Sequence, residues 1–134
     1  MAGRAVNEVG TELAGDGHEM SMEEMILFAE EGVIDIHTDD EIARAAGLPA
    51  AVVPGVQLMA SIHEMLHREY GFDSVPGTIL EVRFRAIVLA GDTVTARGRV
   101  TGVEGQRINL EVWCENQRGE QVVTGTAQVA VASG

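Results

Sequence analysis

The sequence predicts an α+β fold in which one antiparallel sheet wraps around a long central helix. Hydrophobic residues recur at helical spacing in the first half of the chain, and from Thr78 onward they alternate with polar residues. The resulting order is three helices followed by four consecutive strands. The apolar surface of the longest helix and the single apolar face of the sheet are then expected to pack against each other, because each would otherwise be exposed to water.

Composition places the chain among soluble globular proteins, and we expect residues 1–134 to form a single domain. No apolar run is long enough to cross a bilayer, and the N-terminus lacks a secretory pattern, so we expect a cytoplasmic protein. The net charge of −12 argues against nucleic acid and anionic membranes as partners. Cys114 lies in an alternating run, which predicts a buried structural side chain.

The N-terminal half begins with a short predicted strand near residues 9–13. Two capping boxes follow, SMEE at residues 21–24 and TDDE at residues 38–41, and each predicts the start of a short helix. We expect the first of these helices to stop at Gly32 and the second at Gly47, because glycine is the preferred residue just beyond a helix.

The third predicted helix begins at Pro54 and Gly55 and runs to about Tyr70, with Gly71 as its C-cap. Its apolar residues cover close to half of the circumference, which predicts a mostly buried helix. The remaining polar stripe is expected to face solvent and consists of Gln57, Ser61, Glu64 and Arg68.

Four antiparallel strands complete the chain, with turns at Gly91-Asp92, at Glu104-Gly105 and at NQRGE. Together with the apolar helix they match the hotdog arrangement. The inward faces expected for these strands are Leu80 to Ala86, Val94 to Val100, Ile108 to Cys114 and Val123 to Val131, taking every second residue.

The stretch HEMLH, residues 63–67, matches the H-E-x-x-H pattern of zinc proteases. A third ligand is required, and Asp73 falls at the position where one protease clan places it, but Tyr70 stands where that clan needs glycine. No methionine turn follows. We therefore predict no metal site, with His63 and His67 at the border of the buried helix face and Glu64 in solvent.

Three further stretches carry a resemblance to a known family: EEGVIDIHTDDEIARAAGLPAAVVPGVQLMA (30–60), VRFRAIVLAGDTVTARGRV (82–100) and VVTGTAQVAV (122–131). They resemble the MaoC-like enoyl-thioester hydratases, also called hydratase 2, whose pattern runs G-D-x-N-P-I/L-H-x-D and later H-G-M into the central helix. The resemblance implies a hotdog domain, usually dimeric, that adds or removes water on an acyl thioester without a cofactor.

Carried over residue by residue, the resemblance makes His37 the catalytic histidine and Gly55 the residue whose backbone amide binds the thioester oxygen. Four positions depart from the family pattern: the aspartate is Gly32, the asparagine is Ile34, the proline is Asp35 and the histidine before glycine is Pro54. Asp35 is a candidate orienter or substitute acid, against the alternative of a solvated carboxylate. Glu30 and Glu31 are weaker candidates for the same role.

The leading functional prediction is dehydratase or hydratase chemistry on an enoyl or β-hydroxyacyl substrate of fatty acyl or polyketide type, or a related isomerisation or cyclisation. The alternative is a catalytically silent hotdog subunit that partners an active paralogue. The expected partners are an acyl-CoA or carrier-protein thioester and a second subunit, in a homodimer or a heterodimer. Four arginines, expected on one outward face of neighbouring strands, either contact phosphates or are simply solvated: Arg83, Arg85, Arg97 and Arg99.

Overall fold

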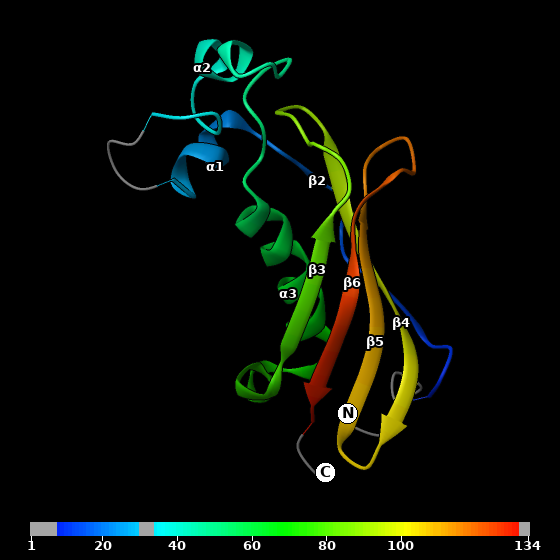
Figure 1. Cartoon of the computed structure of the whole chain (residues 1–134). Helices are drawn as coiled ribbons and strands as arrows, with labels where there is room; N and C mark the ends of the chain where they lie inside the picture. The colour runs from blue at the N-terminus through cyan, green and yellow to red at the C-terminus, as the bar shows by residue number, and fades with distance from the viewer. Residues whose placement is uncertain (1–7, 30–33, 132–134) are drawn as a thin grey trace.

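A computed structural model describes residues 8–29 and 34–131 of the chain. A long helix lies against one face of a six-stranded antiparallel sheet, as Figure 1 shows. The elements are β1 (Glu12–Ala14), β2 (His18–Glu19), α1 (Met22–Leu27), α2 (Asp40–Ala45), α3 (Gly55–Tyr70), the 3-10 helix η2 (Phe72–Gly77), β3 (Ile79–Phe84), β4 (Thr93–Glu104), β5 (Arg107–Glu115) and β6 (Gln121–Ala130).

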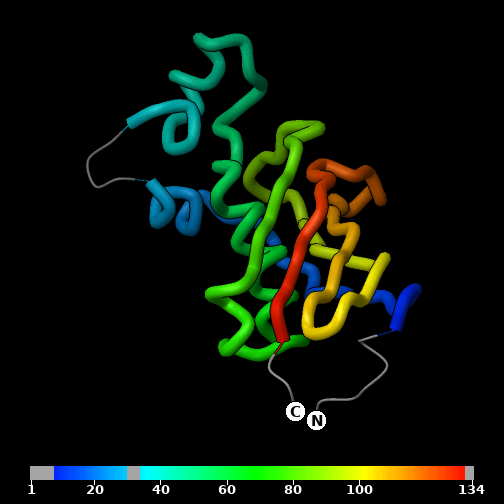
Figure 2. The backbone as a smooth tube through the Cα atoms, turned by 60° about the horizontal axis from the view of Figure 1, so that its bottom comes forward, coloured from blue at the N-terminus to red at the C-terminus, as the bar shows by residue number. Residues whose placement is uncertain are grey.

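The sheet runs in the order β1-β4-β5-β6-β3, with β2 pairing to β4 beside β1. Its inner face and the inner side of α3 share one contiguous hydrophobic core. The alternation predicted for β4, β5 and β6 is confirmed, since each inward apolar side chain of these strands is buried, from Val94 through Leu110 and Cys114 to Val129. The predicted α+β architecture is therefore confirmed. Figure 2 shows α1 and α2 to one side of the sheet, near the start of α3.

The helix start predicted at SMEE is confirmed, with Ser21 as the N-cap, because its hydroxyl accepts a hydrogen bond from the Glu24 backbone amide at 3.2 Å. The Glu24 carboxylate accepts from the Ser21 hydroxyl at 3.3 Å. The helix ends sooner than predicted, at Leu27, and Gly32 lies outside the described residues. The second capping box was wrong by one residue. Asp39 is the N-cap of α2 and its carboxylate accepts from the Ile42 amide, whereas Thr38 accepts from the backbone of the preceding loop. Both residue types cap well, so the loop decided between them.

The bounds of α3 are confirmed, and Gly71 ends the helix at a φ of 86°, a conformation that favours glycine. One position of its predicted polar stripe was wrong, because Gln57 is buried. The segment before α1 covers this first turn, and the Gln57 side-chain amide donates to the Met20 sulfur at 3.4 Å. In the described part of the chain no helix, α3 included, is long and apolar enough to cross a bilayer.

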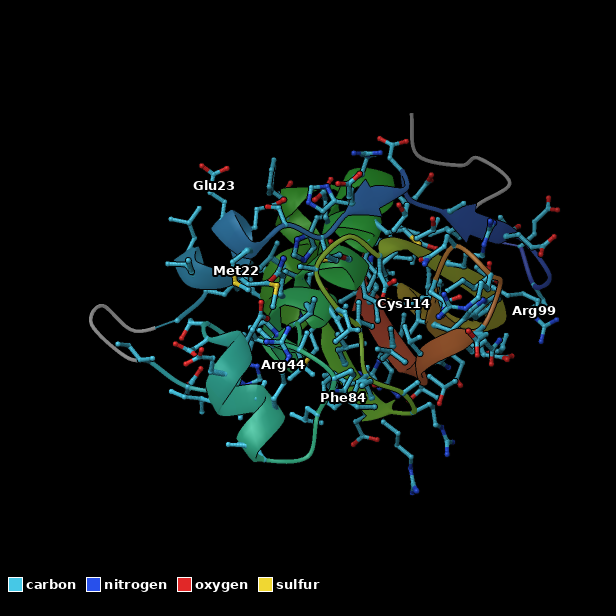
Figure 3. All side chains as sticks on the ribbon, turned by 90° about the horizontal axis from the view of Figure 1, so that it is seen from above. Met22, Glu23, Arg44, Phe84, Arg99 and Cys114 are labelled. Carbon is cyan, nitrogen blue, oxygen red and sulfur yellow. The ribbon has the colours of Figure 1, made fainter. Side chains whose placement is uncertain are left out.

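The expected arginine face was also wrong, because β3 and β4 lie at different places in the sheet and are separated by β5 and β6. In Figure 3, Arg99 of β4 lies far across the sheet from Phe84 of β3. Arg97 and Arg99 are paired with carboxylates of β5, at 2.9 Å and 2.7 Å. The two arginines of β4 are thus already neutralised within the sheet. The short strand β2 and the helix η2 were not predicted.

Candidate functional site

The loop between α1 and α2 carries the predicted catalytic histidine, and Asp35 organises this loop. The Asp35 carboxylate accepts the backbone N–H of His37 at 2.8 Å, and its own amide donates to the Thr38 hydroxyl at 3.0 Å. The Asp35 carbonyl also accepts from the amides of Thr38 and Asp39. Such an Asx turn holds a short loop in one conformation. Asp35 therefore contacts the backbone of His37 and positions it.

A hydrogen bond between Nδ1 and the Val52 carbonyl oxygen, at 2.9 Å, holds the half-buried imidazole of His37. A carbonyl oxygen only accepts, so Nδ1 carries the hydrogen. In the neutral ring the lone pair then lies on Nε2, the nitrogen that points away from this contact. The Val52 amide donates to the Ile36 carbonyl at 3.0 Å, which ties the two backbone segments together beside the ring.

The segment that contacts His37 leads directly into α3. It is fixed at its start by Asp40, whose carboxylate accepts the Ala51 amide at 2.8 Å. It is fixed further on by the Val53 amide, which donates to the Val88 carbonyl at 2.7 Å. The segment is buried from Ala51 to Pro54. This extended and buried backbone holds the start of α3 in place relative to His37.

The N-terminus of α3 has no side-chain cap, because Pro54 occupies the cap position with extended backbone angles. The first amides of a helix lack partners within the helix and carry the positive end of its dipole, which suits an anionic oxygen. A Cβ at Gly55 would lie 2.7 Å from the ring of Phe84. Glycine therefore allows the aromatic ring of β3 to lie directly against this helix terminus.

Two of the predicted site residues, His37 and Gly55, are connected through Val52. The His37 ring is hydrogen-bonded to Val52, and Val52 precedes Gly55 by three residues, so the Cα atoms of Val52 and Gly55 are separated by at most about 11 Å. Pro54 lies between them as the helix cap. The loop position Ile34 is exposed. The predicted roles of Glu30, Glu31 and Gly32 concern residues outside the described part of the chain.

The outer face of α3 borders an open groove of about 990 Å³ that extends from Val56 to Phe72. The rings of His63 and His67 meet there with centroids 5.5 Å apart. Burial, followed by the charge of His67, lowers the pKa of His63. In the described part of the chain, the buried Nε2 of His67 has no hydrogen-bond partner. Glu64 is paired with Arg68 at 3.0 Å. Within residues 8–29 and 34–131, no three His, Cys, Asp or Glu side chains form a cluster able to hold a metal.

A smaller cavity of about 250 Å³ lies on the neighbouring side of α3, under α1 and the segment that precedes it. Gln57 borders this cavity and was missed by the sequence analysis, which placed it in solvent. The helical periodicity could not reveal it, because the elements that cover Gln57 are distant in sequence.

Comparison with known proteins identifies the same family as the sequence motifs. The family model described as "MaoC like domain" matches residues 5–112. The (R)-hydratase from A. caviae involved in PHA biosynthesis is 25% identical, with a TM-score of 0.79 over 93% of this chain and 97% of that one. No curated protein matches the sequence.

Two solved assemblies contain chains of the same fold. The ChsH1-ChsH2 complex from Mycobacterium tuberculosis includes a chain 23% identical, with a TM-score of 0.79 over 93% of this chain and 98% of that one. The HadBC (3R-hydroxyacyl-ACP dehydratase) complex of the same organism includes one 22% identical, with a TM-score of 0.68 over 90% of this chain and 96% of that one. These neighbours support the hotdog fold.

Proposed function

The chain belongs to the MaoC-like domain family, and on this premise we propose that it transfers protons on an acyl thioester. The substrate carries a double bond between the α- and β-carbons of the thioester or a hydroxyl group on the β-carbon, as in enoyl and β-hydroxyacyl chains of fatty acyl or polyketide type. The carrier is CoA or an acyl carrier protein. The reaction is hydration or dehydration, or a proton shift on the same kind of substrate.

The observation that carries this proposal is the hydrogen bond between His37 Nδ1 and the Val52 carbonyl. This bond leaves Nε2 as the nitrogen that exchanges protons. It also holds the ring against Val52, which lies three residues before the start of α3. General acid and base catalysis requires a titratable group held within reach of the reacting atoms. The Gly55 amide supplies the complementary group, a donor for the oxygen on which negative charge develops.

The proton transfers balance with a single imidazole. In hydration, Nε2 of His37 takes a proton from water as the oxygen attacks the β-carbon, and the electrons of the double bond move toward the thioester oxygen at the Gly55 amide. The imidazolium then returns that proton to the α-carbon. Dehydration follows the same steps in reverse. Loss of the family's second acid/base group at Gly32 is expected to slow such a reaction by roughly 10² to 10⁴.

A double-bond shift or a cyclisation suits one histidine equally well. Each requires removal of a proton beside a stabilised carbonyl and its return at another carbon. We therefore include isomerisation and cyclisation in the proposed reaction class. The Asp35 carboxylate acts in every case as a positioning group, since its contact is with the backbone amide of His37.

The test is turnover of short- and medium-chain enoyl-CoA substrates, followed by loss of enoyl absorbance and by product analysis. We expect His37→Ala to lose about 10²- to 10⁴-fold in kcat. Asp35→Asn keeps an oxygen that accepts the His37 N–H, so it should retain most activity, whereas Asp35→Ala should not. Asp73→Asn, an exposed carboxylate on η2, serves as the matched control. Equal rates for wild type and His37→Ala would refute the mechanism.

We propose that a second subunit covers the open face of α3. Val56 and Phe72 on this face are 58% and 85% exposed, and the edge strand β3 exposes Ile79 and Phe84. Apolar surface left open in a protomer commonly marks an interface. Native mass spectrometry should show a dimer for the wild type, and Val56→Arg should shift it toward monomer. A monomeric wild type at micromolar concentration would contradict this assembly.

The second candidate function is a silent subunit that completes a dimer with an active paralogue. Gly32 and Ile34, at positions where the family pattern has polar residues, favour it. Under this alternative the purified chain lacks turnover by itself. It should form a stable mixed dimer with a MaoC-like chain that retains G-D-x-N-P-x-H. Turnover by the isolated chain that depends on His37 would exclude the silent role.

A further inference from the structure

Gln57 presents an unexplained polar group at the wall of the smaller cavity. Its side chain is buried, with 4% of its surface exposed, and it lies in the first turn of α3. Its Nε2 donates to the Met20 sulfur at 3.4 Å, and its buried Oε1 has no hydrogen-bond partner among the described residues. A thioether sulfur only accepts, so this amide orientation is the one that leaves the carbonyl oxygen unpaired. Buried carbonyl oxygens are normally satisfied, and an exception calls for an explanation.

The cavity beside Gln57 is large enough for part of a ligand. Its volume of about 250 Å³ corresponds to roughly eight water molecules at liquid density. Apolar side chains line part of its wall, including Met20, Phe28 and Met65. A wall in which apolar side chains and an unpaired acceptor occur together is typical of a site that orients a ligand through a hydrogen bond.

Charges at the cavity border restrict the ligand's chemistry. Three carboxylates lie there, those of Asp16, Glu24 and Glu64. The Arg68 guanidinium is shared between Asp16 and Glu64, at 3.1 Å and 3.0 Å, and His18 contacts Glu24 at 2.7 Å. The balance of charge is negative, which disfavours a carboxylate or phosphate. A neutral group that donates a hydrogen bond, such as a hydroxyl, is compatible with the negative charge at the border and can donate to the Gln57 oxygen.

We propose that this cavity is a specificity subsite that holds a hydroxyl-bearing part of the acyl substrate, with Gln57 Oε1 accepting the hydroxyl hydrogen. The inference rests on the proposed function, because it uses the Gly55 amide as the anchor of the thioester carbonyl. Gln57 follows Gly55 by two residues, a rise of about 3 Å along the helix axis. Two residues also turn the helix by about 200°, so Gln57 lies on the opposite side of the axis from the Gly55 Cα. A substrate held at the helix terminus reaches the Gln57 subsite by extending along that side, within one turn. The preferred substrate is accordingly an oxygenated chain and not a plain aliphatic one.

The test compares enoyl-CoA substrates with and without a hydroxyl group, placed at successive carbons beyond the double bond. Wild type should prefer one hydroxylated member over the plain chain by about tenfold in kcat/KM, the usual effect of one hydrogen bond to a buried acceptor. Gln57→Met keeps the volume and removes the acceptor. It should lose this preference and still process the plain chain. Ser61→Ala, a change in the same cavity that leaves Gln57 in place, should keep the preference.

Binding of saturated acyl-CoA ligands, plain and hydroxylated, is measured in parallel by calorimetry, so that the outcome does not depend on turnover. Turnover without any hydroxyl preference overturns the subsite and leaves the proposed function standing. A hydroxyl preference in binding that Gln57→Met abolishes, without turnover, supports the subsite and contradicts the proposed function. Equal binding of both ligands, or no binding of either, shows a cavity that holds only water and overturns the inference.

Discussion

Gly125 of β6 is the position where a single methyl group should most disturb the sheet. It pairs with Val82 of β3. A Cβ at this position would overlap the Glu81 carbonyl oxygen and would lie 2.9 Å from the Val82 Cα. Both atoms belong to the backbone of β3, so no rotamer change relieves the overlap. Gly125→Ala must therefore push β3 away from β6.

The expected cost follows from these contacts. Overpacking of this kind costs about 1–3 kcal/mol, and each ladder hydrogen bond that breaks adds about 1 kcal/mol. We expect Gly125→Ala to lower the free energy of unfolding by about 3 kcal/mol, which corresponds to a decrease of about 10 °C in Tm for a domain of this size. Because Phe84 on β3 lies against Gly55, the candidate site should open as well.

Urea denaturation measures the loss of unfolding free energy, and hydrogen exchange measures the loosening of β3. Gly102→Ala is the matched control, because a Cβ there would meet Asn109 at an ordinary distance of 3.5 Å. Exchange should accelerate in β3 for Gly125→Ala and not for the control. If the two variants were equally stable to within about 0.5 kcal/mol, the close packing of β3 on β6 described above would be wrong.

Three further predictions concern titrating side chains. Burial raises the pKa of the single cysteine, Cys114, to about 12, so a chromogenic thiol reagent at pH 8 should react only after unfolding. Burial, with the nearby charge of Glu69, raises the pKa of the single tyrosine, Tyr70, to about 12. An ultraviolet titration should show the Tyr70 phenolate appearing near pH 12. The contribution of the neutral phenol to the free energy of unfolding is complete below pH 10 and should be lost as the pH rises to about 12. Burial and His67 lower the pKa of His63 below 6.5, so stability should fall as the pH drops below that value, and His63→Gln should reduce the slope in a pH series of urea titrations.

Much of the fold followed from patterns that span only a few residues. The bounds of α3 were set by a proline, two glycines and a run of helical periodicity, and the structure confirms them. The buried faces of β4, β5 and β6 followed from strict alternation. Local signals were less decisive where two of them competed, as at Thr38 and Asp39, since either residue type caps a helix.

Strand order and local environments did not follow from the sequence. Arg83 of β3, Arg85 just after it and the two arginines of β4 have the same alternation, yet it is Arg97 and Arg99 of β4 that pair with carboxylates of β5. Gln57 has the periodicity of a solvent-facing residue, and the segment around Met20 buries it. In each case the deciding partner is distant in the chain, and its position depends on how the strands pair and the loops close.

The amino-acid sequence by itself determined most of the elements, the buried faces of the main strands, the family and the identity of His37 and Gly55 as the site residues to examine. Only the tertiary structure decided that the Asp35 carboxylate holds a backbone amide, that Val52 orients the His37 ring, and that Gln57 faces a cavity with an unpaired oxygen. Periodicity and caps act between neighbours in the chain. Hydrogen-bond partners and cavities arise where segments separated by many residues come together. A pattern of neighbouring residues does not show which distant segments will be close in space.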